Sequence, residues 1–436
     1  MDDDCAPWAS DLIGATINED QLRLVEILGE GAYGVVFRAI DESSPTSSAN
    51  PEPRQFAVKI MERADTRTRR WRAQQREVAS HLTVSDHPNI VSVHDVFECE
   101  FFIYIVLDLC VGGDLFNPMI EKLVYCRNDA LIKSVFVQLL DAVQYCHDHG
   151  VYHRDLKPDN ILTNEDGSEI KLADFGLSTT AKVSDTFGCG SQNYMSPECI
   201  GQDYDHHPYS TEASDIWALG VILSNLVAGR NPWDYATMND KCFMRYLVDP
   251  NYLREILPIS QESSEILQAI FTTDPGLRIT IPALRERILA VETFFMSDED
   301  LEHATMHVQM AAAVYSPPGV QRLALARQLS ICTDSEALRL LQQRSTPLQS
   351  RTSEKAKFAI CSSSDIFSDT SSTTDESDGP ITPQTRAQDP VKLQLAEIPD
   401  FGEKEKIGTA VVPVIRKGRS LPSYYDEIPP PIGVVL

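Results

Sequence analysis

Residues 153–160 (HRDLKPDN) constrain the fold of this chain more than any other stretch, together with the triplet Asp174-Phe175-Gly176, which begins fourteen residues after Asn160. Taken alone, each run of polar residues is compatible with a surface turn. Taken together, they place two carboxylates, an ammonium group and an amide at spacings that phosphoryl transfer requires. The stretch therefore predicts a chemical site, and we expect the rest of the chain to fold around it.

A glycine-rich stretch lies upstream, with strand-forming residues on both sides of it. Gly29, Gly31 and Gly34 follow the pattern G-x-G-x-x-G, and Val36 comes two residues later. Glycines let backbone N–H groups approach a phosphate without an intervening Cβ. Dinucleotide-binding folds share these positions but need a helix after them, whereas a strand is expected here. A tight hairpin without any ligand is the plainer alternative.

Lys59 interrupts a short apolar strand, residues 56–60, and a basic segment of helical character follows at residues 67–82. A single lysine in a strand often only prevents the edge of a sheet from pairing with another chain. A buried ammonium group, however, needs a carboxylate partner. Glu77 is the first choice because apolar residues surround it in the sequence, and Glu62 is the second.

The secondary-structure pattern changes at about residue 109. Before it, apolar runs predict strands around a polar loop at residues 41–54. After it, apolar residues at helical spacing predict buried helices at residues 131–149 and 215–223. The predicted parts are a flexible N-terminal tail (1–21), a strand-rich lobe (22–109), a hinge with a helical lobe (110–295), a short helical extension (296–345) and a disordered Ser/Thr-rich tail (346–436).

Charge and cysteine usage narrow the class of protein. The chain has 38 basic and 64 acidic side chains, a net charge of −26, which argues against a nucleic-acid-binding face and favours basic partners. The ten cysteines form no C-x-x-C pair, and the N-terminus has no apolar leader. No apolar run is long enough to span a membrane. We expect an intracellular protein, cytoplasmic or also nuclear, with reduced thiols.

The order and spacing of these motifs resemble those of eukaryotic protein kinases of the serine/threonine type, from about Leu22 to Phe295. The glycine-rich stretch, Ala57-Val58-Lys59, residues 153–160, residues 174–176 and Ser196-Pro197-Glu198 occur in the family order. Within the family, residues 188–198 resemble the fungal nutrient-responsive, meiosis-repressing kinases. The resemblance implies a bilobal kinase fold of the α+β class, a monomer, and transfer of the γ-phosphoryl group of ATP to protein hydroxyls.

The resemblance also implies a role for each residue of the catalytic motifs. Asp155 would accept the proton of the substrate hydroxyl, and Lys157 would contact the transferring phosphoryl group. Ser191 would bridge these two residues, which favours a Ser or Thr acceptor. Asp174 and Asn160 would bind Mg²⁺. Lys59, paired with Glu77, would contact the α and β phosphates.

The same residue-wise comparison assigns the nucleotide pocket, for which ordinary core packing is the alternative. Leu107 would be the gatekeeper, Asp108 and Cys110 would offer hinge backbone groups, and Asp114 would reach the ribose. The side chains implied to enclose adenine are Leu28, Val36, Ala57 and Leu162, below the loop of Gly29, Gly31 and Gly34.

Other motif residues are implied to be structural or regulatory. Glu198 would pair with Arg278, and Asp215 would bond the backbone of the catalytic loop. Arg154 would meet a phosphate on the activation segment, for which Thr186 is the nearest candidate, although one extra residue separates it from Ser191.

The sequence also predicts a substrate preference and a partner for the tail. Asp114 and Asp159 near the cleft predict Arg or Lys about three positions before the acceptor. Asn225, at a place where some related kinases carry an acid, predicts less demand two positions before it; the plainer alternative is that these acids are only solvated. In the tail, residues 416–422 resemble a phosphosite that a phosphoserine-reading adaptor would bind. A pseudokinase or scaffold that acts through the tail is the main alternative function, and a small-molecule kinase is the third.

Overall fold

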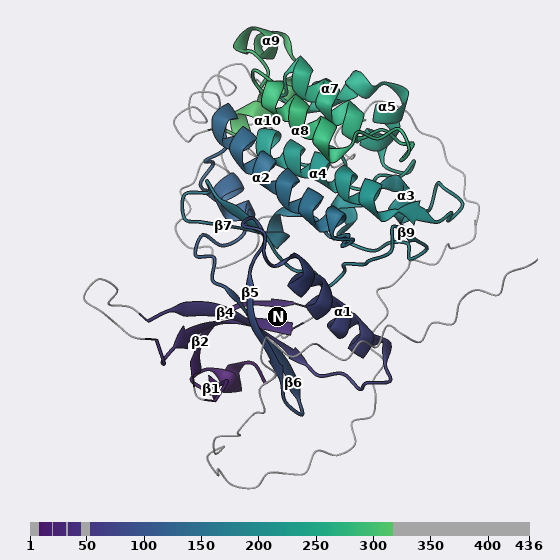
Figure 1. The fold of residues 1–436 in the computed structure, drawn as a ribbon. Helices are drawn as coiled ribbons and strands as arrows, with labels where there is room; N and C mark the ends of the chain where they lie inside the picture. The colour runs from purple at the N-terminus through teal and green to yellow at the C-terminus, as the bar shows by residue number, and fades with distance from the viewer. Residues whose placement is uncertain (1–7, 20, 32–33, 45–52, 317–436) are drawn as a thin grey trace, which may run out of the picture. The chain divides into compact units, whose positions relative to one another are not determined.

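The computed structural model describes residues 8–19, 21–31, 34–44 and 53–316 of the chain (Figure 1). Strands dominate before residue 109 and helices after it, as the sequence predicts. No helix in this described part of the chain combines the length and the apolar character needed to cross a membrane.

The N-terminal part is a six-stranded antiparallel sheet in the order β1-β2-β3-β4-β6-β5. Its strands follow the period of two that a sheet imposes, since Val35, Phe37 and Ala39 are buried on one face of β3 while their neighbours are not. The bounds are β1 (Thr16–Ile17), β2 (Leu22–Gly31), β3 (Gly34–Asp41), β4 (Gln55–Glu62), β5 (Val93–Glu98) and β6 (Phe102–Asp108).

Helix α1 (Arg69–Val84) packs on one face of this sheet through Trp71, Val78 and Leu82, which contact Met61 and Ile105 among other residues (Figure 1). The helix begins where Thr68 caps it, accepting a hydrogen bond of 3.2 Å from the backbone of Trp71. It therefore carries the side chains of its inner face into the space beside β4.

The opposite face of the sheet is covered by the N-terminal segment, so the predicted tail at residues 1–21 is wrong for its described part. Ala9 is fully buried, Trp8 lies 4.9 Å from the ring of Phe102 and donates a 2.7 Å hydrogen bond to Glu62, and β1 pairs with β2. A 3₁₀ turn, η1 (Ser10–Leu12), and a two-residue strand are too short for periodicity to reveal them.

The helical part is organised around α4 (Thr211–Ala228), whose residues are buried almost throughout. Ser210 caps its start and Gly229, at φ +64°, ends it. The other helices are α2 (Asp129–Asp148), α3 (Pro197–Ile200), α5 (Lys241–Val248), α6 (Leu253–Ile256), α7 (Gln261–Ile270), α8 (Ile281–Ala290), α9 (Asp298–His303) and α10 (Met306–Val314). Short turns of helix are η2 (Asn117–Glu121), η3 (Pro158–Asn160), η4 (Gln192–Tyr194) and η5 (Pro250–Tyr252).

Two small antiparallel sheets frame the central loops. They are β7 (Ile161–Thr163) with β8 (Ile170–Leu172), and β9 (Val183–Ser184) with β10 (Tyr209–Ser210). The first follows the stretch at residues 153–160 and is joined to the strand-rich part by a bridge between Ile90 and Leu172. The second anchors the segment that follows Asp174.

The packed unit continues beyond the predicted boundary at residue 295. Within the expected extension, α9 and α10 are described, and Val308 of α10 is fully buried. Tyr315 lies against Gly229, where a Cβ would overlap its ring, and donates a 2.9 Å hydrogen bond to the Leu226 carbonyl. The remainder of the extension and the tail at 346–436 lie outside the described residues.

Candidate active site

A buried ion-pair cluster joins β4, α1 and the segment after β8. Lys59 Nζ lies 2.5 Å from Glu77 Oε1 and 2.9 Å from Asp174 Oδ1. The side chains of Lys59 and Glu77 are 12% and 5% exposed, whereas that of Asp174 is 36% exposed. Glu77, and not Glu62, is therefore the partner of Lys59, and Asp174 forms the open side of the cluster.

The electrostatics of this cluster keep Lys59 charged. Burial opposes the charged form, but the carboxylates of Glu77 and Asp174 outweigh it and raise the pKa of Lys59. Burial also raises the pKa of Glu77, against the attraction of Lys59. At Asp174 the ammonium group prevails over burial and lowers the pKa. The open carboxylate is thus held ionised, as a cation ligand must be.

The catalytic-loop candidates form a second polar cluster. Ser191 Oγ donates to Asp155 Oδ1 and accepts from Lys157 Nζ, both at 2.8 Å. Lys157 Nζ is also 3.0 Å from Asp155 Oδ2. Asn160 Nδ2 donates to the carbonyl of Asp155 at 2.8 Å and to its Oδ2 at 3.1 Å. Four residues named from the sequence therefore share one bonded network.

Asp215 of α4 holds the backbone of this loop from below, as the resemblance implied. Its carboxylate accepts from the backbone N–H groups of His153 at 2.9 Å and Arg154 at 2.8 Å, and His147 Nε2 lies 2.9 Å away. Arg154 is at φ +64° and Asp174 at φ +61°, a region that non-glycine residues rarely adopt. Such strain persists only where the surroundings enforce it, and here the hydrogen bonds of Arg154 to Asp215 and of Lys59 to Asp174 do so.

The nucleotide-pocket candidates gather between the sheet and β7. Ala57 pairs with Leu107 across β4 and β6, and Leu162 of β7 bridges to Asp114. Leu28 is 45% exposed, whereas Val36 and Leu162 are half-buried. Leu28, Val36 and Leu162 are therefore less covered than core residues, which leaves surface for a flat ligand, whereas Ala57 is buried.

The hinge candidates differ in what their backbone groups offer. The N–H of Asp108 donates to the carbonyl of Ser92 at 3.1 Å, while the N–H of Cys110 has no hydrogen bond within the described residues. Burial opposes the charge of the Asp108 carboxylate, but hydrogen bonds from Lys171 and His94 prevail and lower its pKa to about 2. Cys110 is thus the hinge N–H that is open to a ligand.

The loop glycines have distinct reasons for lacking a side chain. Gly34 is at φ +145°, and a Cβ there would overlap the carbonyl of Ile60, so only glycine fits. At Gly29 and Gly31 a Cβ would meet nothing within 4 Å, so their backbone borders open space. This is the surface that a phosphate approaching the loop would use.

His81 is a site-adjacent residue that the sequence reasoning missed. It lies one helical turn after Glu77, its ring is 4.8 Å from that of Phe175, and its Nε2 is 2.7 Å from the carbonyl of Val91. Burial lowers the pKa of His81 to about 4, so the ring is neutral at physiological pH. The spacing of four from Glu77 along a helix is the signal that could have identified it.

The activation segment does not bring Arg154 to Thr186. Arg154 Nε donates to the carbonyl of Leu177 at 2.8 Å, and no hydrogen bond joins it to Thr186 in the described structure. Thr186 is exposed, and its carbonyl accepts from Tyr209 Oη at 3.0 Å. The next residue, Phe187, packs on His206 and Tyr209 with ring distances of 5.0 and 5.9 Å. Aromatic packing therefore supports this segment here.

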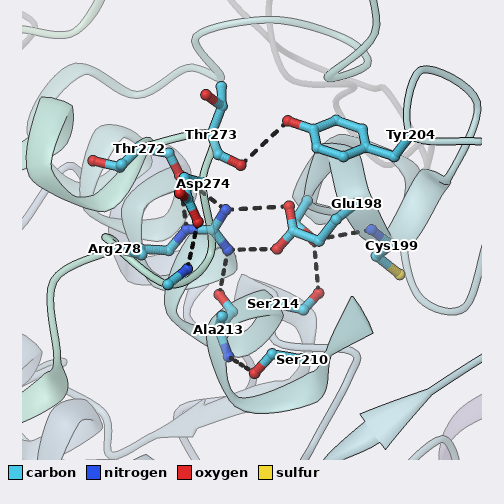
Figure 2. A network of polar contacts seen from close by, with 12 residues as sticks. Glu198, Cys199, Tyr204, Ser210, Ala213, Ser214, Thr272, Thr273, Asp274 and Arg278 are labelled. Carbon is cyan, nitrogen blue, oxygen red and sulfur yellow. Dashed lines mark hydrogen bonds and ion pairs between the residues drawn. The ribbon is translucent and has the colours of Figure 1, made fainter. Parts of the chain in front are cut away.

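Figure 2 shows the buried pair that ties the segment to the helical part. Arg278 donates to the two carboxylate oxygens of Glu198 at 2.6 and 3.1 Å, to the carbonyl of Ala213 at 2.7 Å and to the carbonyl of Thr272. The Arg278 and Glu198 side chains are 0% and 4% exposed. The pairing implied by the resemblance is present, and every donor direction of the guanidinium is used.

Asn225 was wrongly expected near the substrate. It is fully buried in α4, where its amide nitrogen donates to Asn231 at 2.8 Å and its oxygen accepts from Tyr194 at 3.0 Å. Asp159, by contrast, is exposed beside the catalytic loop. Only Asp159 and the half-buried Asp114 remain as acids of the expected substrate surface.

Comparison with known proteins matches residues 22–288 to the family described as protein kinase domain. The relatives include the negative regulator of sexual conjugation and meiosis of Schizosaccharomyces pombe, 42% identical over 292 residues, which are 63% of this chain and 60% of that protein. The serine/threonine-protein kinase ksp1 of the same yeast is 39% identical over 236 residues, 52% of this chain and 49% of that protein.

A third relative is the serine/threonine-protein kinase VHS1 of Saccharomyces cerevisiae, 30% identical over 323 residues, 61% of this chain and 69% of that protein. The chain thus spans between about half and two thirds of the length of these relatives. The resemblance to serine/threonine kinases, with a fungal regulator of meiosis among them, is confirmed.

Proposed function

The chain belongs to the protein kinase family, and we propose that it is a serine/threonine protein kinase that transfers the γ-phosphoryl group of ATP to Ser or Thr hydroxyls of protein substrates. The observation that carries the proposal is Ser191 Oγ, bonded at 2.8 Å to both Lys157 and Asp155. A base and a cation thus stand side by side, as transfer to a hydroxyl requires.

Asp155 is the general base in this proposal. Its Oδ1 and Oδ2 are engaged by Ser191 and Lys157, so the carboxylate is oriented before a substrate arrives. A substrate hydroxyl near Oδ1 would give up its proton to it, while Lys157 balances the charge of the phosphoryl oxygens. General-base assistance of this kind contributes roughly 10²- to 10⁴-fold to a rate.

Lys59 and the glycine-rich loop would hold the phosphates of ATP. Glu77 and Asp174 both contact the Lys59 ammonium group, which fixes its position and keeps it protonated. Open space beside Gly29 and Gly31 lets the loop backbone approach phosphate oxygens. Adenine would lie between Leu28, Val36, Ala57 and Leu162, behind Leu107, with the N–H of Cys110 and the carbonyl of Asp108 on its edge and Asp114 near the ribose.

Protein kinases use a divalent metal, and we propose that it is Mg²⁺ on Asp174 and Asn160. Asn160 uses its amide nitrogen for Asp155, which leaves its oxygen as a ligand. Asp174 uses Oδ1 for Lys59 and for the backbone of Gly176, which leaves Oδ2. Mg²⁺ needs few protein oxygens because phosphates supply the others, and when bound it offsets phosphate charge.

The substrate class we propose is a protein segment with basic residues before the acceptor. Asp159 is exposed next to the loop, and the net charge of −26 favours basic ligands generally. Since Asn225 is buried, the preference rests on Asp159 and Asp114. A positional peptide library should show enrichment of Arg or Lys before the acceptor, and a library without that enrichment would contradict this part alone.

The cellular role is proposed by analogy. One relative is named a negative regulator of sexual conjugation and meiosis, and we place this chain in comparable intracellular signalling, nutrient response or cell-cycle control, in the cytoplasm or nucleus. A phosphoserine-reading adaptor at residues 416–422 remains a proposal on sequence alone, because that stretch lies outside the described residues. The kinase domain that we propose spans residues 22–295, as the sequence predicts, and residues 8–19 and 296–316 pack on it.

Thr186 is the phosphorylation site we propose on the activation segment. Its side chain is exposed and close to Phe187, which already packs the segment. A Thr186→Ala variant should lose part of its specific activity, whereas Thr180→Ala, at another exposed threonine of the segment, should not. Full activity in Thr186→Ala would contradict this proposal and would mean that the packing of Phe187 orders the segment without a phosphate.

The decisive test measures phosphate transfer from Mg-ATP by the full chain. Asp155→Asn should lower the rate roughly 10²- to 10⁴-fold yet keep the thermal shift caused by ATP. Asp174→Ala should lose both transfer and metal-dependent thermal shift. Asp148→Asn, at an exposed carboxylate on α2, is the control. Wild-type transfer by Asp155→Asn would refute the base, and absence of transfer by all four proteins would favour the pseudokinase or scaffold alternative.

A further inference from the structure

The carboxylate of Asp108, the last residue of β6, forms a set of hydrogen bonds that the proposed reaction does not use. Lys171 Nζ donates to its Oδ2 at 2.9 Å, and His94 Nε2 lies 2.7 Å from its Oδ1. The backbone N–H of Ser92 also donates to Oδ2, at 3.2 Å. We call these four residues the hinge clamp. The nucleotide pocket needs only the backbone carbonyl of Asp108, so its side chain requires a separate explanation.

The partners of Asp108 belong to both parts of the structure. His94 lies in β5 of the strand-rich part, whereas Lys171 is the central residue of β8 in the helical part. In the pairing of β8 with β7, Lys171 is opposite Leu162, a candidate for the adenine pocket, and Asp174 follows three residues after Lys171. One carboxylate therefore joins the hinge to the strand that leads to the metal-ligand candidate.

The chain just before β5 is anchored to β8 through its backbone. The N–H of Leu172 donates to the carbonyl of Asn89 at 2.8 Å, and the N–H of Val91 donates to the carbonyl of Leu172 at 2.9 Å. The N–H of Asp108 in turn donates to the carbonyl of Ser92 at 3.1 Å. The hinge clamp therefore extends a backbone anchor to the end of β6, where the chain leaves the sheet.

The far end of the hinge is anchored as well. The N–H of Gly112 donates to the carbonyl of Thr163, the last residue of β7, at 3.0 Å. Residues 109–111 lie between this bond and Asp108, and they include Cys110, whose N–H has no hydrogen bond within the described residues. So short a segment, held at both ends, has little freedom. The clamp thus helps to position the Cys110 N–H relative to β7.

The hinge clamp is stronger than an isolated surface pair. The side chains of Asp108, His94 and Lys171 are 24%, 33% and 33% exposed. An isolated exposed pair contributes little, but donors that converge on one partly buried carboxylate strengthen each other. Burial opposes the charge of Asp108, yet its pKa is lowered because the hydrogen bonds from Lys171 and His94 outweigh the burial.

We infer that Asp108 is a positioning residue whose carboxylate, through Lys171, holds the hinge in the place relative to β7 that adenine requires, and thereby sets the affinity for ATP. The inference rests on the proposed function, in which adenine lies between the sheet and β7. The clamp is formed together with the Lys59–Glu77 pair, so it stabilises the arrangement that we propose for phosphate binding. Loss of the clamp should therefore weaken ATP binding and leave the catalytic loop intact.

The test measures the dissociation constant of the full chain for the non-hydrolysable ATP analogue AMP-PNP with Mg²⁺, by calorimetry. Asp108→Asn and Lys171→Met should each raise it about three- to tenfold, as the loss of a charged hydrogen bond at a partly exposed site predicts. The double variant should bind no more weakly than either single one, because all three remove the same interaction. Asp108→Glu, which keeps the carboxylate, should recover part of the affinity. The control Asp141→Asn, which removes an acid paired with Arg285 outside the hinge, should bind like the wild type.

A second readout separates positioning from a general loss of stability. Without nucleotide, amide exchange of residues 107–112 should be faster in Lys171→Met than in the wild type, whereas exchange of α8 should be the same. In phosphorylation of a basic peptide, Lys171→Met should raise the KM for ATP without lowering kcat, since Asp155 and Lys157 belong to a separate bonded network.

Unchanged affinity in both single variants, or additive losses in the double variant, would overturn the inference. Tighter binding of the analogue by either variant would overturn it too, because the clamp would then oppose the arrangement that binds the nucleotide. A wild type that binds no nucleotide would refute the proposed function and the inference together. Normal binding by the wild type with equal binding by the variants would refute the inference alone.

Discussion

Removing the guanidinium of Arg278 should cost more stability than removing a comparable surface arginine, and the structure gives the size. Arg278→Ala leaves the Glu198 carboxylate, 4% exposed, without its two hydrogen bonds of 2.6 and 3.1 Å. Breaking one side of such a buried pair costs about 3–5 kcal/mol. The carbonyls of Ala213 and Thr272 also lose their donor, so the upper end of that range is expected.

The matched control is Arg285→Ala, because Arg285 Nε is 2.8 Å from Asp141 but the two side chains are 43% and 41% exposed. Exposed pairs contribute about 0–1 kcal/mol. For a unit of about 300 residues, a loss of about 5 kcal/mol in Arg278→Ala corresponds to a Tm decrease of about 8 °C, worked from the average entropy of unfolding per residue.

Urea unfolding followed by tryptophan fluorescence, with Tm as a second readout, measures both variants. A double variant, Glu198→Leu with Arg278→Leu, should recover part of the loss because no charge is then left buried. If Arg278→Ala and Arg285→Ala lose the same free energy, or if the double variant is worse than the sum of its parts, the reasoning from burial fails.

Three further predictions concern other buried contacts. The folded pKa of His81, about 4, is below its ordinary value of 6.5, so its contribution to stability is present above pH 6.5 and declines as pH falls toward 4, by up to about 3 kcal/mol. Between pH 7 and pH 5 the Tm of the wild type should therefore decrease relative to that of His81→Leu. A constant Tm difference would contradict the assignment. Trp8→Ala should lower stability by about 2 kcal/mol and increase proteolysis of residues 8–19, since the half-buried ring packs on Phe102; wild-type resistance would show that the segment is not held by this ring. Gly229→Ala should be strongly destabilising in the wild type and less so beside Tyr315→Ala, because the Tyr315 ring occupies the space of the new Cβ; equal costs in both backgrounds would refute the contact.

The local motifs could be predicted from the sequence because their chemistry is encoded over a few residues. The bonds of Asp155 to Lys157, Asn160 and Ser191 join residues whose types and spacing were already informative. Glu77 was also predictable, since a buried ammonium group requires a carboxylate and few candidates stood among apolar residues.

The missed features depend on contacts between distant segments. Asn225 has the same residue type whether it faces a substrate or a buried partner, and only the position of Asn231 and Tyr194 decides between them. The N-terminal segment shows no periodicity because single residues such as Trp8 and Ala9 do its packing. Likewise, the support of the activation segment by Phe187 requires Tyr209 and His206 from beyond α3.

Helix α1 contacts the candidate site on one side and exposes charged residues on the other. Its inner side carries Glu77, bonded to Lys59, and His81, whose ring contacts that of Phe175 next to Asp174. Both contacts depend on the same rotation of the helix, so Lys59 and the loop that carries Asp174 are positioned by one element. The opposite side carries charge that its own helix disfavours. The relative positions of Lys59 and Phe175 therefore depend on how this one helix packs on the sheet.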